Sequence, residues 1–308
     1  MNDNEMIQGK GWGGLNPMYT SPALSIVSAS LHLPPSAQSR TFAPMKPIDT
    51  HSHLYSNKFE RDLDEVIARA KESLSAVFLP NIDLASVEAM HQLTAKAPEF
   101  FFPMMGLHPC DVKEGFEQTL DQLKSYLDDP AQTYYAIGET GLDLYWDKST
   151  LPLQQEALKV QVNWAKDHQL PIVLHARNAI DETADLIESQ LDERLSGIFH
   201  CFDGSVQQAE RIISFNTFKI GIGGIVTYRK DVQAMVEATP LEAMVLETDS
   251  PYLPPEPHRK DKPRRNESSY TKYVCQKVAE LKDVSYEEVA RITNANAQAV
   301  FHTAPIAS

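Results

Sequence analysis

Histidine and carboxylate side chains recur just after short apolar runs in this 308-residue chain. His175, for example, directly follows Pro171-Ile172-Val173-Leu174. An apolar run that ends in a metal-ligating side chain is typical of a buried strand, and parallel barrels build their active sites at the carboxyl ends of such strands. The pattern therefore predicts a metal site at one rim of a barrel. The residues that share this placement are His51, His53, His108, Glu139, His175, His200 and Asp249.

From residue 47 onward, apolar runs alternate with segments of helical periodicity. Leu63, Val66, Ile67 and Ala70 recur at three- and four-residue spacing and form one apolar face. Eight strands with intervening helices predict an α/β fold, a (β/α)8 TIM barrel. A doubly wound open sheet is the alternative, but no glycine-rich phosphate loop follows the first run. We expect strands at 47–51, 76–80, 102–106, 134–138, 171–175, 197–200, 217–221 and 244–248, and closing helices near 268–282 and 285–301.

The first 44 residues differ from the rest of the chain because they lack a clear apolar periodicity. We expect 1–44 to be a disordered leader or a non-native extension, followed by the barrel at 45–303 and a tail at 304–308. A secretory signal peptide needs a basic region ahead of its apolar core, whereas this chain begins Met1-Asn2-Asp3-Asn4-Glu5.

Composition narrows the partners and the compartment. The net charge of −14 argues against strong nonspecific binding to duplex DNA, which depends on Lys and Arg. No apolar run reaches 18 residues, so we expect no membrane-spanning helix and no membrane partner. Cys110, Cys201 and Cys275 are far apart and form no C-x-x-C pair, which favours reduced thiols and a cytoplasmic location. The oligomeric state is left open.

His51 and His53 form an H-x-H pair at the end of the first predicted strand. Residues two apart on a strand point to the same side, so both imidazoles can bind one metal ion. Imidazole nitrogens and carboxylate oxygens are common zinc ligands, and carboxylates also suit magnesium and manganese. The pair alone is weak, because two polar residues on a surface turn give the same pattern. The interpretation gains strength because five of the ten histidines follow predicted strands.

Taken in their order along the chain, these motifs resemble the TatD family of metal-dependent deoxyribonucleases, within the amidohydrolase-like barrels. The resemblance covers residues 45–303 and implies a TIM barrel of the metal-dependent hydrolase type. One departure is Asp203, where the family pattern has Ser or Thr. The motifs that carry the resemblance are Asp49-Thr50-His51-Ser52-His53-Leu54, Gly106-Leu107-His108-Pro109, Ile137-Gly138-Glu139-Thr140-Gly141-Leu142-Asp143, Leu174-His175, Phe199-His200-Cys201-Phe202 and Glu247-Thr248-Asp249-Ser250-Pro251-Tyr252-Leu253.

The resemblance implies a cofactor of two divalent metal ions, with Mg, Mn and Zn as candidates. Two ions that share a water lower its pKa and stabilise the attacking and leaving oxygens of a phosphodiester. The expected nucleophile is therefore a metal-activated water. The implied ligands are His51, His53 and Asp249 for one ion, His175 and His200 for the other, and Glu139 between them.

Other residues are given supporting roles. Asp249 is also expected to take the proton of the water, and Glu139 to fix the separation of the ions. Asp49 is expected to orient an imidazole from behind. His108 is assigned to substrate binding, with metal ligation and a structural role as alternatives. The predicted phosphate-binding residues, in a loop whose alternative is a solvated basic run, are Arg264, Arg265 and Asn266.

The resemblance implies hydrolysis of DNA phosphodiester bonds, as a deoxyribonuclease that acts 3′ to 5′ on single strands or 3′ ends. The other enzyme hypothesis is a binuclear-metal hydrolase of carboxylic esters or amides, including aminoacyl-tRNA. A third hypothesis is a catalytically silent barrel that binds nucleic acid. The complete set of potential ligands argues against this third hypothesis.

Overall fold

The structure is a computed structural model that describes residues 45–262 and 264–303. The predicted leader at 1–44 and tail at 304–308 lie outside the described residues. Within the described part, a three-stranded and a five-stranded sheet hold parallel strands that neighbour one another in chain order. The strands are β1 (Ile48–Asp49), β2 (Ala76–Leu79), β3 (Phe101–Pro103), β4 (Ile137–Asp143), β5 (Ile172–Arg177), β6 (Gly197–Phe199), β7 (Phe218–Ile222) and β8 (Met244–Leu246).

Two isolated bridges join the sheets into a closed barrel. A parallel bridge between Met105 and Ile137 connects the end of β3 to β4. A second parallel bridge pairs Ser52 with Ser250, beyond the ends of β1 and β8. The predicted (β/α)8 barrel is thus confirmed, and closure removes the exposed strand edges that an open sheet would leave.

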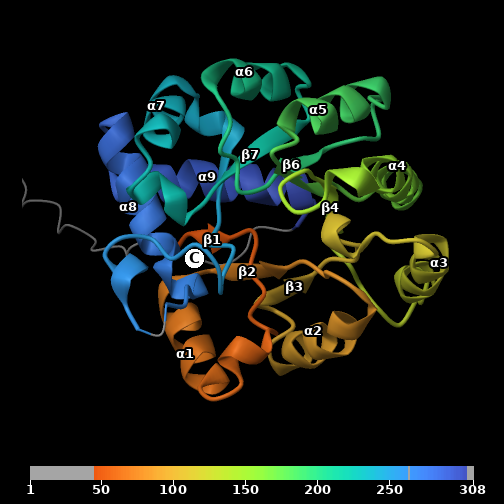
Figure 1. Ribbon diagram of the computed structural model, residues 1–308. Coiled ribbons are helices and arrows are strands. Elements are labelled where there is room, and N and C mark those ends of the chain that lie inside the picture. The colour runs from red at the N-terminus through yellow and green to blue at the C-terminus, as the bar shows by residue number, and fades with distance from the viewer. Residues whose placement is uncertain (1–44, 263, 304–308) are drawn as a thin grey trace, which may run out of the picture. The chain divides into compact units, whose positions relative to one another are not determined.

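Helices surround the strands on the outside of the barrel (Figure 1). The predicted closing helices begin at residues 271 and 286, and residues 268–270 form a short 3-10 turn ahead of the first of them. No described helix is long and apolar enough to cross a membrane. The helices are α1 (Leu63–Ser73), α2 (Leu84–Lys96), α3 (Phe116–Leu127), α4 (Leu151–His168), α5 (Ile180–Ser189), α6 (Val206–Ser214), α7 (Lys230–Ala238), α8 (Thr271–Lys282) and α9 (Tyr286–Phe301).

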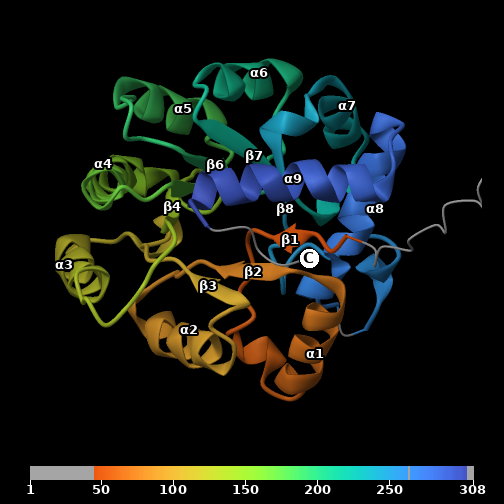
Figure 2. The ribbon, with the colours of Figure 1, turned by 180° about the vertical axis from the view of Figure 1, so that it is seen from behind.

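The last helix, α9, lies across the amino-terminal end of the barrel (Figure 2). The Asn294 side chain on α9 accepts a hydrogen bond from the backbone N–H of Ile48, at 2.9 Å. The ring of Phe301 stacks on Phe78 of β2, with 3.8 Å between centroids. Ile198 of β6 and apolar residues of β1, β2, β3, β5 and β8 join Phe301 in one buried apolar cluster. The amino-terminal end of the barrel is therefore packed with hydrocarbon, which leaves the opposite end for chemistry.

Strand β4 lies further along the chain than predicted, at Ile137–Asp143 instead of 134–138. Its buried residues include Glu139, Thr140 and Asp143, which in the sequence resemble the start of a polar loop. Gly141 has φ of +142°, and a Cβ there would lie 2.0 Å from the backbone oxygen of His175. A glycine is needed because β4 and β5 approach this closely beside the site.

Candidate metal centre

The rim at the carboxyl ends of the strands gathers all the residues predicted as metal ligands. His51 and His53 follow β1, and Asp249 follows β8. The backbones of these two segments are bonded to each other, since the N–H of Asp249 donates to the carbonyl of His51 at 2.9 Å. Glu139 and His175 lie on β4 and β5, and His200 directly follows β6. The closed barrel therefore brings residues that are almost 200 positions apart into one cluster.

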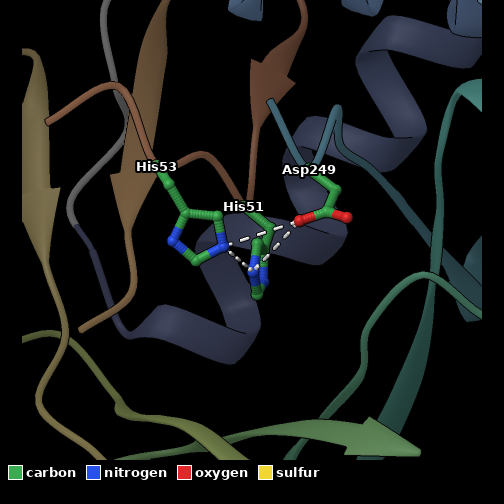
Figure 3. Close-up of side chains that lie close together, drawn as sticks. All are labelled: His51, His53 and Asp249. Carbon is green, nitrogen blue, oxygen red and sulfur yellow. Dashed lines mark hydrogen bonds and ion pairs between the residues drawn. The ribbon is translucent and has the colours of Figure 1, made fainter. Parts of the chain in front are cut away.

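One part of the cluster consists of His51, His53 and Asp249 (Figure 3). The Nε2 atoms of the two histidines are 3.3 Å apart. Oδ1 of Asp249 lies 3.5 Å from Nε2 of His53 and 3.9 Å from Nε2 of His51. Three ligand atoms thus converge on one small volume, and the second oxygen of Asp249 points away from both rings (Figure 3).

Glu139 lies between two groups of histidines. Its Oε2 is 3.1 Å from Nε2 of His51 and 3.4 Å from Nε2 of His53. Its Oε1 is 2.9 Å from both Nδ1 of His175 and Nε2 of His200. Each carboxylate oxygen therefore faces one half of the predicted ligand set, which is the arrangement that a bridging ligand requires.

His108 also faces Glu139, with its Nε2 3.4 Å from Oε1. Its Nδ1 accepts a hydrogen bond from the backbone N–H of Cys110, at 3.1 Å, so Nε2 is free to face the cluster. His108, Glu139 and His175 form a potential ligand group of their own. Since Nδ1 accepts, the proton of the neutral ring lies on Nε2, which suits a hydrogen bond to Glu139 or to substrate better than metal ligation.

Burial and proximity shift the pKa values of the cluster in opposite directions. Burial alone raises the pKa of Glu139, but the positive potential of His200, His108 and His51 outweighs it and holds the pKa well below the usual range. For His53, burial lowers the pKa, and the facing carboxylates of Asp249 and Glu139 raise it to about 10. Glu139 is thus kept ionised beside the basic ring nitrogens.

Polar groups behind the cluster fix the orientation of two rings. The hydroxyl of Tyr55 donates to the carbonyl of Pro80 at 2.5 Å and lies 2.9 Å from Nδ1 of His53. Oδ2 of Asp143 lies 2.9 Å from Nε2 of His175. Hydrogen bonding of the remote ring nitrogen fixes the tautomer and the direction of the near one. Tyr55 and Asp143 therefore determine which nitrogen of each ring faces Glu139.

Asp49 does not orient an imidazole, and that prediction is wrong. Its Oδ1 accepts the backbone N–H groups of His51 and Thr248, at 3.3 and 2.9 Å. Its Oδ2 accepts the hydroxyl of Thr248 at 2.7 Å. Burial raises the pKa of Asp49 to about 7, in spite of these donors. The residue holds together the backbones of the two segments that carry His51 and Asp249.

The cluster lies in a cavity of about 550 Å³. His53, His108, Glu139, His175, His200 and Asp249 line it together with Trp146, Arg177, Arg229 and Tyr252. A cavity of this size falls in the range that encloses a small organic ligand. The site can therefore accept one nucleotide-sized group beside the potential metal ligands.

The predicted phosphate-binding loop is not brought into this cavity. Arg265 donates to both carboxylate oxygens of Asp62, each at 2.6 Å, and to the carbonyl of Lys58. Asn266 is buried and donates to the carbonyl of Thr248 at 2.8 Å. Arg264 is exposed and is not among the residues that line the cavity. The geometry gives Arg265 and Asn266 structural contacts and does not support a contact with phosphate.

Asp203, the departure from the family pattern, is paired with an arginine. Nη1 of Arg229 donates to Oδ2 of Asp203 at 2.7 Å, and its other nitrogens donate to Asp231. Both Asp203 and Arg229 line the cavity. The negative charge of Asp203 is therefore balanced by Arg229. The guanidinium of Arg229 is paired with two carboxylates, so it attracts an anionic ligand less strongly.

The sequence analysis gave no role to several residues of the site, among them Tyr55, Asp143 and Arg177. Tyr55 lies two positions after His53, and Asp143 and Arg177 are the last residues of β4 and β5. The two-residue periodicity of a strand was the available signal for Tyr55. The predicted fourth strand ended at 138, which is why Asp143 received no role.

Known proteins share the sequence pattern and the fold of this chain. The model of a protein family described as TatD related DNase matches residues 48–302. The chain belongs to this family. The predicted resemblance is thereby confirmed, and the protein is a hydrolytic enzyme of the TatD type, built on the (β/α)8 barrel.

The match to individual relatives covers nearly the whole length of each relative. The uncharacterized metal-dependent hydrolase YabD of Bacillus subtilis is 36% identical over 256 residues, which is 82% of this chain and 98% of that protein. A 3′-5′ ssDNA/RNA exonuclease, TatD of Citrobacter rodentium, is 31% identical over 82% of this chain and 97% of its own length. The crystal structure of YjjV, a TatD homologue from Escherichia coli, superposes with a TM-score of 0.77 at 28% identity and covers 84% of this chain and 99% of its own.

Proposed function

We propose that this protein removes nucleotides from the 3′ end of single-stranded DNA, and that two divalent ions at the barrel rim are required. The observation that carries the proposal is Glu139, whose two oxygens face separate groups of histidines. TatD relatives named as 3′-5′ ssDNA/RNA exonucleases support the choice of bond and polarity.

The donor chemistry fits divalent ions. The Nε2 atoms of His51 and His53 face each other at 3.3 Å, and both face Oε2 of Glu139. Lone pairs that converge in this way need a proton or a cation between them, and imidazole with carboxylate suits Zn, whereas Mg and Mn prefer the carboxylates. His51, His53 and Asp249 would hold one ion, His175 and His200 would hold the other, and Glu139 would contribute to both sites.

Bound ions would supply Lewis acidity, which lowers the pKa of a water and neutralises charge on a phosphodiester. Asp249 is placed to accept the proton of an attacking water, because one of its oxygens points away from the histidines (Figure 3). Burial raises the pKa of Asp249. The hydrogen bond from His53 and the positive potential of the cluster lower this pKa by more than burial raises it, so the carboxylate is ionised. Tyr55 and Asp143 keep His53 and His175 in place during the reaction.

The cavity favours a strand end over a duplex. His53 and Glu139 line the cavity and are buried, so a phosphodiester must enter the cavity to reach them. One unpaired nucleotide can do this, whereas a base-paired one would first have to leave its stack. A cytoplasmic location also stays a prediction, which the three free cysteines support.

The test is a nuclease assay on a 5′-fluorescent single-stranded DNA, after chelation and after addition of Mg, Mn or Zn. We expect a ladder that shortens from the 3′ end only when metal is added. Asp249→Asn should abolish the ladder, whereas Asp121→Asn, on the exposed surface of α3, should leave it unchanged.

Other results would redirect the proposal. Cleavage of RNA but not DNA would change the substrate and keep the chemistry. Hydrolysis of aminoacyl-tRNA or of a carboxylic ester, without any nuclease activity, would replace the proposal with the alternative hydrolase. No hydrolysis of any substrate by metal-loaded protein would leave only a binding role.

A further inference from the structure

Two large aromatic side chains follow β4, and the second of them lines the cavity. Tyr145 is 52% exposed and Trp146 is 71% exposed, whereas Trp164, on α4, is buried. Trp146 lines the same cavity as Glu139 and His175. Leaving a large aromatic surface in water forgoes the free energy of burying it, so its exposure beside a site indicates a ligand surface.

The turn that carries these rings is tied to the metal centre. Oδ1 of Asp143 accepts the backbone N–H groups of Tyr145 and Trp146, at 2.9 and 3.1 Å. Oδ2 of the same carboxylate lies 2.9 Å from Nε2 of His175. The backbone of Leu144 donates to the carbonyl of Arg177 at 2.9 Å. The aromatic turn is therefore held in a fixed position relative to the potential ligands.

Arg177 contacts both rings. Its guanidinium carbon lies 3.8 Å from the ring centroid of Tyr145 and 5.6 Å from that of Trp146. The two rings meet edge to face, with centroids 4.9 Å apart. Among the described residues, no carboxylate forms an ion pair with Arg177, in contrast to Arg229 with its two aspartates. Tyr145 is thus partly covered, while the ring of Trp146 offers an open face beside an uncompensated positive charge.

We infer that Trp146 stacks against a nucleobase of the strand that enters the cavity, and that Arg177 lies beside the adjoining phosphate. The inference rests on the proposed function and adds to it the residues that recognise an unpaired base. Stacking on an aromatic face tolerates every base, and it requires that the base be unpaired. The same contact would explain a preference for single strands, which the metal centre alone does not provide.

The experiment pairs a change in the protein with a change in the substrate. One set of oligonucleotides carries normal bases, and a matched set carries a single abasic residue at each of the three 3′-terminal positions in turn. At one of these positions, loss of the base should reduce kcat/KM of the wild-type enzyme by roughly 5- to 100-fold, the usual contribution of one stacked base. In Trp146→Ala this penalty should disappear, since the stacking partner is already gone.

Two control variants separate stacking from folding. Trp146→Phe keeps an aromatic face and should retain most of the base dependence. Tyr126→Ala removes an aromatic ring that is 41% exposed on α3, is not among the residues that line the cavity, and should behave as wild type. Equal losses of Trp146→Ala on normal and abasic substrates at all three positions would overturn the inference, because the turn would then act only through Asp143 and His175.

A binding measurement keeps this test separate from that of the nuclease. Fluorescence anisotropy with a labelled, uncleavable phosphorothioate oligonucleotide, in chelator, gives affinities with and without the base. A base-dependent affinity that Trp146→Ala removes would support stacking even if no hydrolysis occurred. An affinity that does not depend on the base would overturn the inference. It would also be overturned if sedimentation showed a dimer that requires Trp146 while the affinity for DNA did not depend on the base.

Discussion

The two ends of the barrel are built from the same strands but differ in chemistry. At the amino-terminal end, Phe78 packs on Phe301 of α9 within a wholly apolar cluster. At the carboxyl end, buried His51 and Glu139 face each other at 3.1 Å. A few residues along a strand thus separate a hydrocarbon core from a cluster of titratable groups.

This difference shows how the fold can tolerate a costly site. Buried ionisable groups disfavour folding unless they are paired or bind a metal. The apolar end and the helical layer supply hydrophobic burial that does not depend on the rim. Changes at the rim are therefore expected to affect activity more than stability, and changes under α9 to do the reverse.

The largest effect is expected for Glu139→Gln at the rim. It removes the charge that faces both groups of histidines, so activity should fall by more than the roughly 10–100-fold typical of losing a group behind a ligand. Circular dichroism should show a folded barrel. Glu117→Gln, exposed on α3, is the matched control. Full activity of Glu139→Gln at limiting metal would contradict the proposal that Glu139 links the two ion sites.

Phe78→Ala should give the opposite result at the other end. Truncating a buried Phe costs roughly 3–5 kcal/mol, and about 1 kcal/mol shifts the melting temperature by ~2–4 °C in a domain of this size. We expect a clearly lower melting temperature, with kcat and metal dependence near wild type at 20 °C. Phe78→Leu should lose less. A selective loss of metal affinity without destabilisation would show that the two ends are coupled.

Tyr55→Phe tests a smaller effect within the rim. It removes the hydroxyl that lies 2.9 Å from Nδ1 of His53 and leaves the ring. Metal affinity should fall by roughly 10–100-fold, and saturating metal should restore kcat. Calorimetric titration of the metal-free protein measures this, with Tyr126→Phe as control. An unchanged affinity would mean that Tyr55 does not orient His53.

Arg265→Gln should have the smallest effect, because its partners lie outside the cavity. A partly exposed ion pair contributes up to about 1 kcal/mol, so stability should fall slightly and DNA turnover should stay within about twofold. The hydrogen bond and charge of Arg265 lower the pKa of Asp62. That contribution is present above the ordinary Asp pKa of ~3.9 and is lost as the pH falls below it. The stability difference between wild type and variant should therefore shrink in acid, as thermal melts at pH 3 and pH 7 would show.

The comparison of the two ends also shows what the sequence could and could not indicate. The rim cluster was predictable in position because each of its residues follows an apolar run, and a closed parallel barrel brings such positions together. The contacts of Arg265 were not predictable, because Asp62 lies 203 residues away and only the folded chain pairs the two residues. The end of β4 was missed because Thr140 and Asp143 are polar and yet buried. Helix α9 was predicted, but its place across the amino-terminal end has no signature in its own periodicity.

Metal content, measured by mass spectrometry on wild-type and Glu139→Gln protein after dialysis against equal metal, tests the central claim most directly. The claim is that one carboxylate links two ion sites within a single buried cluster. We predict close to two divalent ions per chain in the wild type, with ion loss in Glu139→Gln and full retention in Glu117→Gln. A single ion in the wild type, or two ions that remain when Glu139 is changed, would contradict the account.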